Sequence, residues 1–181
     1  MKNKRVFWGI SVDKILTSKL NEFKCEFSQK ESQTPVNKWV KAENYHLTLL
    51  FIGPIPENKI PSICWKAEKL FSKTSSFYRQ PKYYTTFPRR KSRMIWLEFI
   101  RSEGFEKLVN ELSKSIFKTH PSNQIIPHIT LTRFKHGLLT DRSWPIDPEL
   151  KLSCTKVNLY ESELTPEGPI YTSIQAFDLK G

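Results

Sequence analysis

A short motif that occurs twice constrains this chain more than any other feature. The first copy is residues 45–49 (YHLTL) and the second is residues 127–131 (PHITL). Because successive side chains of a β-strand point to opposite faces, each copy predicts a strand with polar and aliphatic faces. His46 and Thr48 share one face of the first strand, and His128 and Thr130 share one face of the second. We therefore expect the aliphatic faces to enter a core and the polar faces to line a groove.

The segments around the two motifs alternate between strand and helix patterns. Asp13 and Ser102 are expected helix N-caps, and Pro54 and Pro56 are expected to end the first motif strand. Aliphatic residues at helical spacing predict helices over residues 13–27, 57–71 and 102–117. Loops are expected over residues 28–35 and 135–149. Alternation and β-prone residues predict strands over residues 4–12, 36–40, 45–53, 77–87, 94–100, 127–134, 152–164 and 170–179.

This order of elements favours the α+β class. Helices and antiparallel strands are interspersed without the regular alternation of a doubly wound sheet. The two motif strands fall one in each half of the chain, and each has helix and strand neighbours. We expect two similar lobes that face each other and bring the two polar faces together.

Length and composition indicate one globular unit. A chain of 181 residues, 38% of them hydrophobic, can bury one substantial core, so residues 1–181 are expected to form a single bilobal domain. No apolar run is long enough to span a membrane. Cys25, Cys64 and Cys154 lie far apart, which predicts neither a disulfide framework nor a thiolate zinc site. We expect a cytoplasmic protein.

The charge balance favours an anionic partner. The formal net charge is +11, and a basic surface concentrates polyanions, so nucleic acid is a reasonable partner; charge kept only for solubility is the alternative. The densest basic run is residues 89–93, where Arg93 could meet an RNA backbone or belong to a solvated turn. Aromatic residues such as Phe7 and Trp96 could stack on bases, although aromatics at strand spacing more often belong to a core.

The paired motifs suit acid–base chemistry on a phosphate. Histidine titrates near neutrality, so one imidazole can remove a proton while the other donates one. A threonine two residues after each histidine supplies a hydroxyl donor for phosphate oxygens, and Arg133 can grip the same oxygens. By strict alternation Arg133 faces away from His128, so its participation requires a twist or bulge in the strand. The spacing of His120, His128 and His136 could suggest a metal, but no acidic or thiol cluster accompanies them, and no metal is expected.

With these residues the chain resembles the 2H phosphoesterase superfamily, which is named for two His-x-Thr-x motifs. Within it, the chain resembles the RNA 2',3'-cyclic phosphodiesterases, also called 2'-5' RNA ligases. The resemblance covers nearly the whole chain. It is carried by residues 5–7 (RVF), Trp39, residues 44–53 (NYHLTLLFIG), 127–134 (PHITLTRF), 162–164 (SEL) and 168–171 (GPIY). Some relatives have a basic residue where Leu50 stands here.

The resemblance implies a bilobal fold, with antiparallel sheets lining a central cleft and helices outside. It implies hydrolysis of a terminal 2',3'-cyclic phosphate to a 2'-phosphate without a metal or other cofactor, and a reversible 2'-5' RNA ligase activity. Carried over by position, His46 and His128 are the catalytic pair, and Thr48, Thr130 and Arg133 bind phosphate. Further candidate substrate contacts are Phe7, Arg93 and Tyr171.

RNA with a 2',3'-cyclic phosphate end, such as a tRNA fragment, is the expected partner of a monomeric enzyme. Two alternatives remain at this point. The same machinery could act on another substrate, such as a cyclic nucleotide, an ADP-ribose cyclic phosphate or a 2'-5' oligonucleotide. A non-catalytic RNA-binding module that keeps the cleft would instead bind RNA with a steep salt dependence and fail a hydrolysis assay.

Overall fold

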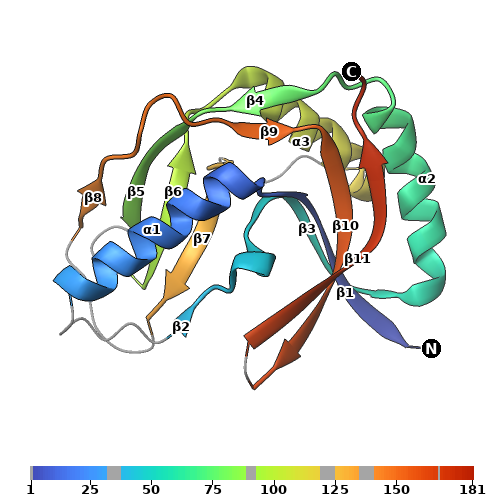
Figure 1. The fold of residues 1–181 in the computed structure, drawn as a ribbon. Helices are drawn as coiled ribbons and strands as arrows, with labels where there is room; N and C mark the ends of the chain where they lie inside the picture. The colour runs from blue at the N-terminus through green and yellow to red at the C-terminus, as the bar shows by residue number, and fades with distance from the viewer. Residues whose placement is uncertain (1, 32–37, 89–92, 119–124, 135–140, 167) are drawn as a thin grey trace.

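Two antiparallel sheets form the frame of the molecule (Figure 1). The computed structural model describes all residues except 1, 32–37, 89–92, 119–124, 135–140 and 167. The four-stranded sheet has the order β11-β10-β1-β3, and the five-stranded sheet has the order β2-β7-β6-β5-β8. The strands are β1 (Asn3–Ser11), β2 (Lys38–Trp39), β3 (His46–Pro56), β4 (Phe77–Arg79), β5 (Pro81–Phe87), β6 (Met94–Phe99), β7 (His128–Arg133), β8 (Ser143–Trp144), β9 (Leu152–Cys154), β10 (Lys156–Thr165) and β11 (Gly168–Asp178).

The two motif strands lie in different sheets, as the sequence predicts. The first motif is on β3, which pairs only with β1 at the edge of the four-stranded sheet. The second motif is on β7, which lies between β2 and β6 in the five-stranded sheet. Leu47 and Leu49 on β3 and Ile129 and Leu131 on β7 are buried in one continuous hydrophobic core. The expected α+β fold with two lobes of antiparallel sheet is confirmed.

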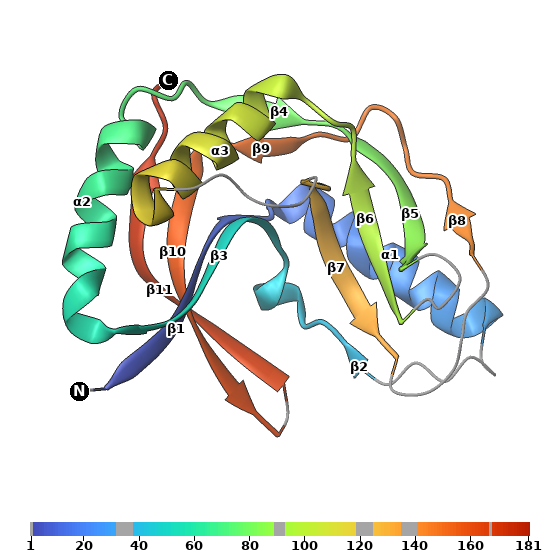
Figure 2. The same ribbon diagram turned by 180° about the vertical axis from the view of Figure 1, so that it is seen from behind.

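Two of the three described α-helices pack against the sheet that does not contain the preceding strand. The three α-helices are α1 (Lys14–Lys30), α2 (Ile60–Phe71) and α3 (Glu103–Phe117), with short 3-10 turns η1 (Ala42–Asn44) and η2 (Glu57–Lys59). Helix α1 follows β1 of the four-stranded sheet but lies across the five-stranded sheet, where Phe23 stacks on Tyr84 of β5 with ring centroids 3.8 Å apart (Figures 1 and 2). Helix α3 follows β6 of the five-stranded sheet but packs beside α2 and β3. Each sheet is therefore covered by a helix that comes from the other.

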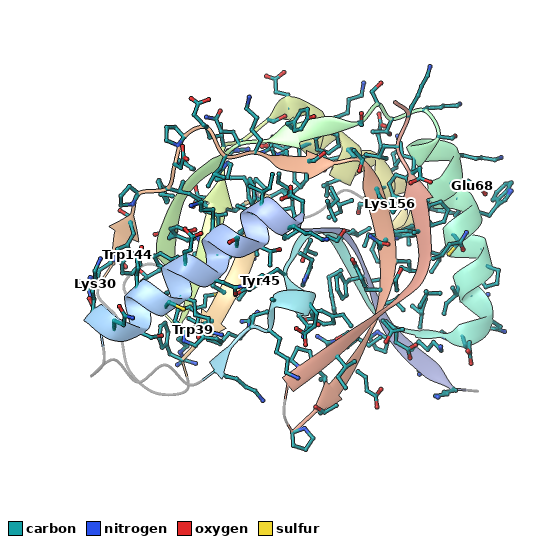
Figure 3. The ribbon with its side chains drawn as sticks, in the orientation of Figure 1. Lys30, Trp39, Tyr45, Glu68, Trp144 and Lys156 are labelled. Atoms are coloured by element: carbon teal, nitrogen blue, oxygen red, sulfur yellow. The ribbon has the colours of Figure 1, made fainter. Side chains whose placement is uncertain are left out.

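The far end of α1 is held by aromatic contacts. Figure 3 shows Trp39 and Trp144 near this end of the helix, close to Lys30. The ring of Phe27 lies 5.7 Å from that of Trp39 and 5.5 Å from that of Trp144. Because Trp39 is on β2 and Trp144 is on β8, one helix residue ties together both edges of the five-stranded sheet.

Asp13 caps α1, as the sequence predicts. Its Oδ1 accepts a hydrogen bond of 2.9 Å from the backbone N–H of Leu16, and its Oδ2 accepts one of 3.4 Å from the N–H of Ser153. We expect Asp13→Ala to lower the free energy of unfolding by about 1 kcal/mol, because the first-turn N–H loses its acceptor. Urea unfolding measures this loss. Asp13→Asn keeps an acceptor and serves as the control; an equal loss in both variants would contradict the capping role.

The two prolines expected to end the first motif strand do not end it. Strand β3 continues through Pro54 to Pro56, and these residues pair with Arg5 and Asn3 of β1. A proline nitrogen cannot donate to a strand ladder, but β3 has a neighbour on one side only. At such an edge the missing donor removes no hydrogen bond from the sheet, which explains the difference.

Three other predicted boundaries were wrong. Helix α1 runs to Lys30 instead of ending near Phe27. The segment expected as one strand over residues 152–164 is split into β9 and β10, because β9 leaves the four-stranded sheet to pair with β4. The segment expected as a loop over residues 135–149 contains β8, which pairs with β5. Residues 135–140 of that loop, including His136, and His120 lie outside the described residues.

Candidate active site

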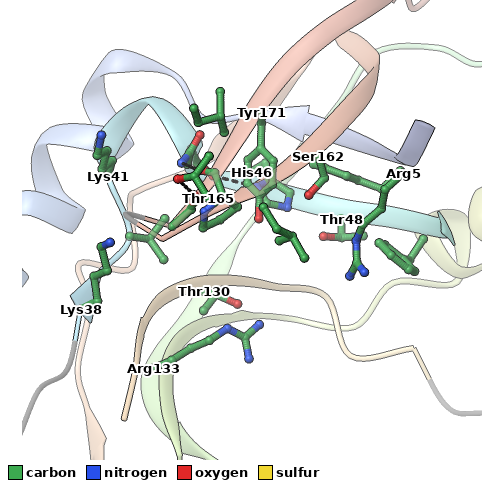
Figure 4. A pocket seen from close by; sticks show the side chains of 18 of the residues that line it. Arg5, Lys38, Lys41, His46, Thr48, Thr130, Arg133, Ser162, Thr165 and Tyr171 are labelled. Carbon is green, nitrogen blue, oxygen red and sulfur yellow. Dashed lines mark hydrogen bonds between the residues drawn. The ribbon is translucent and has the colours of Figure 1, made fainter. Parts of the chain in front are cut away.

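A cavity of about 780 Å³ lies between the two sheets and contains both motifs. Its walls come from β1, β3 and the β10–β11 hairpin on one side and from β2 and β7 on the other. None of its described lining residues is acidic, and four of them carry a permanent positive charge. The lining residues are Arg5, Phe7, Lys38, Trp39, Val40, Lys41, Asn44, His46, Thr48, Phe51, His128, Thr130, Arg133, Ser162, Leu164, Thr165, Gly168, Pro169, Ile170 and Tyr171. Figure 4 shows the labelled side chains of both walls around this space.

The two imidazoles are fixed in the same way. Nδ1 of His46 lies 2.7 Å from the carbonyl oxygen of Asn44, and Nδ1 of His128 lies 2.8 Å from that of Ile126. A carbonyl oxygen only accepts, so each Nδ1 carries the hydrogen and donates it. Nε2 is then a proton acceptor when the ring is neutral and a donor when the ring is charged. Both histidines line the cavity, so this arrangement provides one acid and one base when a single ring is protonated.

A bulge in β7 brings Arg133 to the same side as His128. The pairing with β6 shifts between Ile95 and Trp96, so that Leu131 is an extra residue in β7. Leu131 and Thr132 are consecutive and both fully buried, whereas Arg133 is exposed and lines the cavity. Strict strand alternation would have pointed Arg133 away from the groove, so the sequence analysis predicted that Arg133 could reach it only through a twist or bulge. The structure contains this bulge.

Each histidine rests against an aromatic ring of the neighbouring strand. The ring of Phe7 lies 4.7 Å from that of His46, and the ring of Trp96 lies 4.1 Å from that of His128. The ring of Tyr171 meets the His46 ring edge-on, with ring centroids 5.0 Å apart, and its centroid also lies 5.0 Å from that of Phe7. Phe7 and Trp96 are both almost completely buried, so they restrict the positions of the imidazoles.

Gly9 makes room for the packing around His46. A Cβ atom added there would lie 3.3 Å from the carbonyl oxygen of Leu47, 3.3 Å from the Phe7 ring and 3.4 Å from the His46 ring. Gly9 pairs with Thr48 in β3 as Trp96 pairs with Thr130 in β7. In one sheet the tryptophan itself fills the space beside the histidine, and in the other the Phe7 ring fills the space that the glycine leaves.

We expect Gly9→Val to lower turnover while the protein still folds. The branched side chain must displace Phe7 or His46, and an error of about 1 Å in a reacting group can cost up to about 100-fold in rate. Steady-state kinetics on a cyclic-phosphate substrate measures the loss. Thr172→Val, at an exposed position of β11 outside the cavity lining, is the control. Wild-type turnover in Gly9→Val would show that this close packing does not position His46.

Burial lowers the pKa values of both histidines. For His46, burial lowers the pKa, the hydrogen bond to Asn44 opposes this, and the charge of His128 lowers the pKa further. For His128, burial lowers the pKa, the hydrogen bond to Ile126 opposes this, and Arg133 lowers the pKa while Glu98 raises it. Burial also raises the pKa of the Tyr171 hydroxyl, and the positive charges of Arg133 and Arg5 oppose that rise. The influence of His128 on His46 disfavours the state in which both rings are charged.

The structure brings together all but one of the candidate catalytic, phosphate-binding and substrate-contact residues. His46, Thr48, His128, Thr130 and Arg133 line the cavity. So do Phe7 and Tyr171. Arg93 is exposed and is not among the lining residues; it follows residues 89–92, which are outside the described residues. Its role as a substrate contact stays a prediction.

Sequence reasoning did not identify several residues of the cavity. Arg5 lies two residues before Phe7 on β1, so strand alternation could have placed both on the same face. Lys38 and Lys41 come from a short extended segment with no periodic signal. Gly9 gave no signal either, because the close approach of three groups depends on the fold. Trp96, which could have stacked on a base, is buried against His128 instead.

Two sheets that carry one His-x-Thr motif each, on opposite walls of a single cavity, define a two-histidine phosphoesterase. The family described as LigT like phosphoesterase matches residues 13–96. An RNA 2',3'-cyclic phosphodiesterase of Thermotoga maritima is 32% identical over 79% of this chain and 80% of its own length, and one of Methanothermobacter thermautotrophicus is 28% identical over 97% and 98%. A crystal structure of a Thermus thermophilus protein, 24% identical, superposes with a TM-score of 0.84 over 98% of each chain. The chain belongs to the RNA 2',3'-cyclic phosphodiesterase family of LigT-like phosphoesterases, and it is a hydrolase.

The described part of the chain lacks two features that would indicate a membrane or a metal partner. It contains no helix with the length and apolar character that a membrane crossing requires. Its His, Cys, Asp and Glu side chains form no group of three or more that could hold a metal ion.

Proposed function

We propose that this protein hydrolyses the terminal 2',3'-cyclic phosphate of RNA and leaves a 2'-phosphate and a 3'-hydroxyl. The observation that carries the proposal is the matched pair of imidazoles in one cavity, each with Nδ1 held by a backbone carbonyl and Nε2 left for the substrate. A five-membered cyclic phosphate needs one proton removed from water and one delivered to the departing oxygen. The two rings supply both without further groups.

In the proposed reaction, His128 is the base and His46 is the acid. A water oxygen forms a bond to phosphorus while Nε2 of His128 takes its proton, and the bond from phosphorus to O3' breaks while Nε2 of His46 protonates O3'. Arg133 supports this assignment, because its charge lowers the pKa of His128 and favours the neutral form that a base requires. With His128 neutral, the repulsion that lowers the pKa of His46 disappears, so His46 keeps its proton more readily.

Thr48, Thr130 and Arg133 hold the non-bridging phosphate oxygens in this proposal. Each threonine lies two residues after its histidine on the same face of its strand, so its hydroxyl lies beside the imidazole. Negative charge increases on the non-bridging oxygens as water attacks. Donors that are already in place stabilise that charge without rearrangement.

The substrate in this proposal is the end of an RNA chain, including the tRNA fragments that RNA cleavage produces, and the protein acts as a monomer. The relatives named as RNA 2',3'-cyclic phosphodiesterases support RNA as the substrate. A cavity without described acidic lining residues, in a protein of formal net charge +11, favours a polyanion over a neutral ligand.

Product analysis tests this function. The protein is incubated in excess EDTA with an oligoribonucleotide that ends in a 2',3'-cyclic phosphate, and the products are separated from 2'- and 3'-phosphate standards. We expect the 2'-phosphate alone. A 3'-phosphate product would refute the assignment of the departing oxygen, and binding of RNA without turnover would favour the non-catalytic module.

A further inference from the structure

The cavity extends well beyond the two histidines, toward a pair of lysines. Lys38 on β2 and Lys41 just before η1 line the end that faces the tip of the β10–β11 hairpin. In Figure 4 these two lysines lie on one side of His46, and Arg5 and Thr48 lie on the other. The volume of about 780 Å³ lies in the upper part of the range of roughly 300–1,000 Å³ for small-ligand pockets, which leaves room for more than the reacting group.

The hairpin tip is held against this basic end by specific contacts. The buried side chain of Asn44 donates a hydrogen bond of 2.8 Å to the carbonyl oxygen of Pro169. Gly168, at a φ of 123°, lies so close to Lys38 that an added Cβ would be 3.5 Å from Nζ. The ammonium group of Lys38 therefore lies beside the hairpin turn.

The charges at this end are available to a ligand. Within the described residues, neither Lys38 nor Lys41 forms an ion pair, although several other lysines do. Leu164 and Ile170, on the two strands of the hairpin, line the same end and are 68% and 51% exposed. Two ammonium groups without an ion-pair partner among the described residues, opposite exposed apolar side chains, match a ligand with a phosphate and a sugar or base.

The other end of the cavity is organised differently. The guanidinium group of Arg5 lies 4.6 Å from the centre of the Phe51 ring, and its charge reaches Tyr171, which contacts His46. Arg5 thus belongs to the surroundings of the reacting phosphate. A cyclic phosphate is the last group of its RNA chain. The preceding nucleotides therefore extend from the reacting phosphate toward only one end of the cavity.

We propose that Lys38 and Lys41 form a second phosphate subsite, which binds the phosphodiester one nucleotide before the cyclic end; this rests on the proposed function. Leu164 and Ile170 contact the nucleoside between the two phosphates. The subsite makes the enzyme select an RNA terminus over a free cyclic mononucleotide.

A comparison of two substrate lengths tests the subsite. Cytidine 2',3'-cyclic phosphate has no upstream phosphodiester, whereas adenylyl-(3'-5')-cytidine 2',3'-cyclic phosphate has one. For Lys38→Ala/Lys41→Ala we expect kcat/KM on the dinucleotide to fall about tenfold and kcat/KM on the mononucleotide to stay unchanged, because charge-assisted contacts are lost only on the longer substrate. The salt slope for a longer single strand should decrease by about 0.7.

Three controls make the test specific. Lys73→Ala/Lys107→Ala removes the same charge at positions outside the cavity lining and should leave both substrates unaffected. Lys38→Arg/Lys41→Arg should restore most of the preference for the dinucleotide. Arg5→Ala should lower kcat/KM on both substrates alike. An equal loss on both substrates in the lysine double variant, or a length-dependent loss in Arg5→Ala instead, would overturn the proposal.

A binding measurement separates the subsite from the reaction. The dissociation constants of cytidine 2'-phosphate and of the dinucleotide that ends in a 2'-phosphate are measured by competition with a labelled oligonucleotide. We expect the lysine double variant to bind only the dinucleotide more weakly, also in a His46→Ala background without turnover. If neither 2'-phosphate gains affinity from the upstream phosphodiester in the wild type, the subsite does not exist, whatever the outcome of the hydrolysis assay.

Discussion

Replacing either His46 or His128 with alanine is expected to lower kcat by about 10²–10⁴-fold on an RNA 2',3'-cyclic phosphate, because in the proposed reaction each ring transfers one of the two protons. Both imidazoles line one cavity and are fixed through Nδ1, so neither has an evident substitute. Single-turnover kinetics with saturating enzyme measures the loss, and thermal unfolding checks that each variant folds. A variant that folds and retains wild-type turnover would remove that histidine from the mechanism.

A sulfur leaving group distinguishes the two roles. In a 2',3'-cyclic substrate with sulfur at the 3' bridging position, the departing thiolate needs no proton. We expect this substrate to restore most of the activity of the His46→Ala variant, because His46 is the proposed acid. It should not restore the activity of the His128→Ala variant, which lacks the base. Restoration in the His128→Ala variant alone would exchange the two assignments.

Arg133→Gln is expected to cause the next largest loss, about 10²–10³-fold in kcat, because it removes the charged donor that we propose for the phosphate oxygens. Gln keeps a polar side chain of similar length but no charge. Arg142→Gln removes a charge from an exposed ion pair with Glu31 outside the cavity lining and should leave turnover unchanged. Loss of less than about twofold in Arg133→Gln would show that the bulge in β7 does not bring a functional group to the phosphate.

The same Arg133→Gln variant should change the pH profile in a defined direction. Arg133 lowers the pKa of His128, so its removal raises that pKa toward the ordinary value, and the limb of kcat/KM that belongs to His128 moves to higher pH. His46 receives no such influence from Arg133, so its limb should move less. A movement of the His128 limb to lower pH in the variant would contradict this electrostatic account.

The sequence predicted the catalytic strands better than their surroundings. Each motif carries its own strand signal, a polar face and an aliphatic face at a spacing of two, so both strands and the faces of His46 and His128 could be read directly. Asp13 and Ser102 were also predictable, because an N-cap depends on the residues that follow it within one turn. Each accepts a hydrogen bond from the backbone N–H of the residue three positions further on.

Features that depend on distant neighbours were not predictable in the same way. The continuation of β3 through Pro54 follows from its place at the edge of a sheet, which no local pattern reveals. The pairing of β8 with β5 adds a segment expected as a loop to the sheet, and the pairing of β9 with β4 divides a segment expected as one strand. Lys38 and Lys41 line the cavity because the tip of the β10–β11 hairpin lies opposite them. The sequence around the two lysines does not indicate this contact with a distant segment. The assignment of residues 1–181 to one domain stays a prediction.

The crossed placement of α1 and α3 has a consequence for how the reacting groups are held. A helix that follows a strand of one sheet covers the hydrophobic surface of the other sheet, in both directions. A movement of one sheet along the other would separate both α1 and α3 from the surfaces that they cover. This would expose a large apolar area to water and would therefore cost free energy. The crossed helices therefore resist a change in the distance between the two imidazoles, so that the spacing of the two rings is established before the substrate binds.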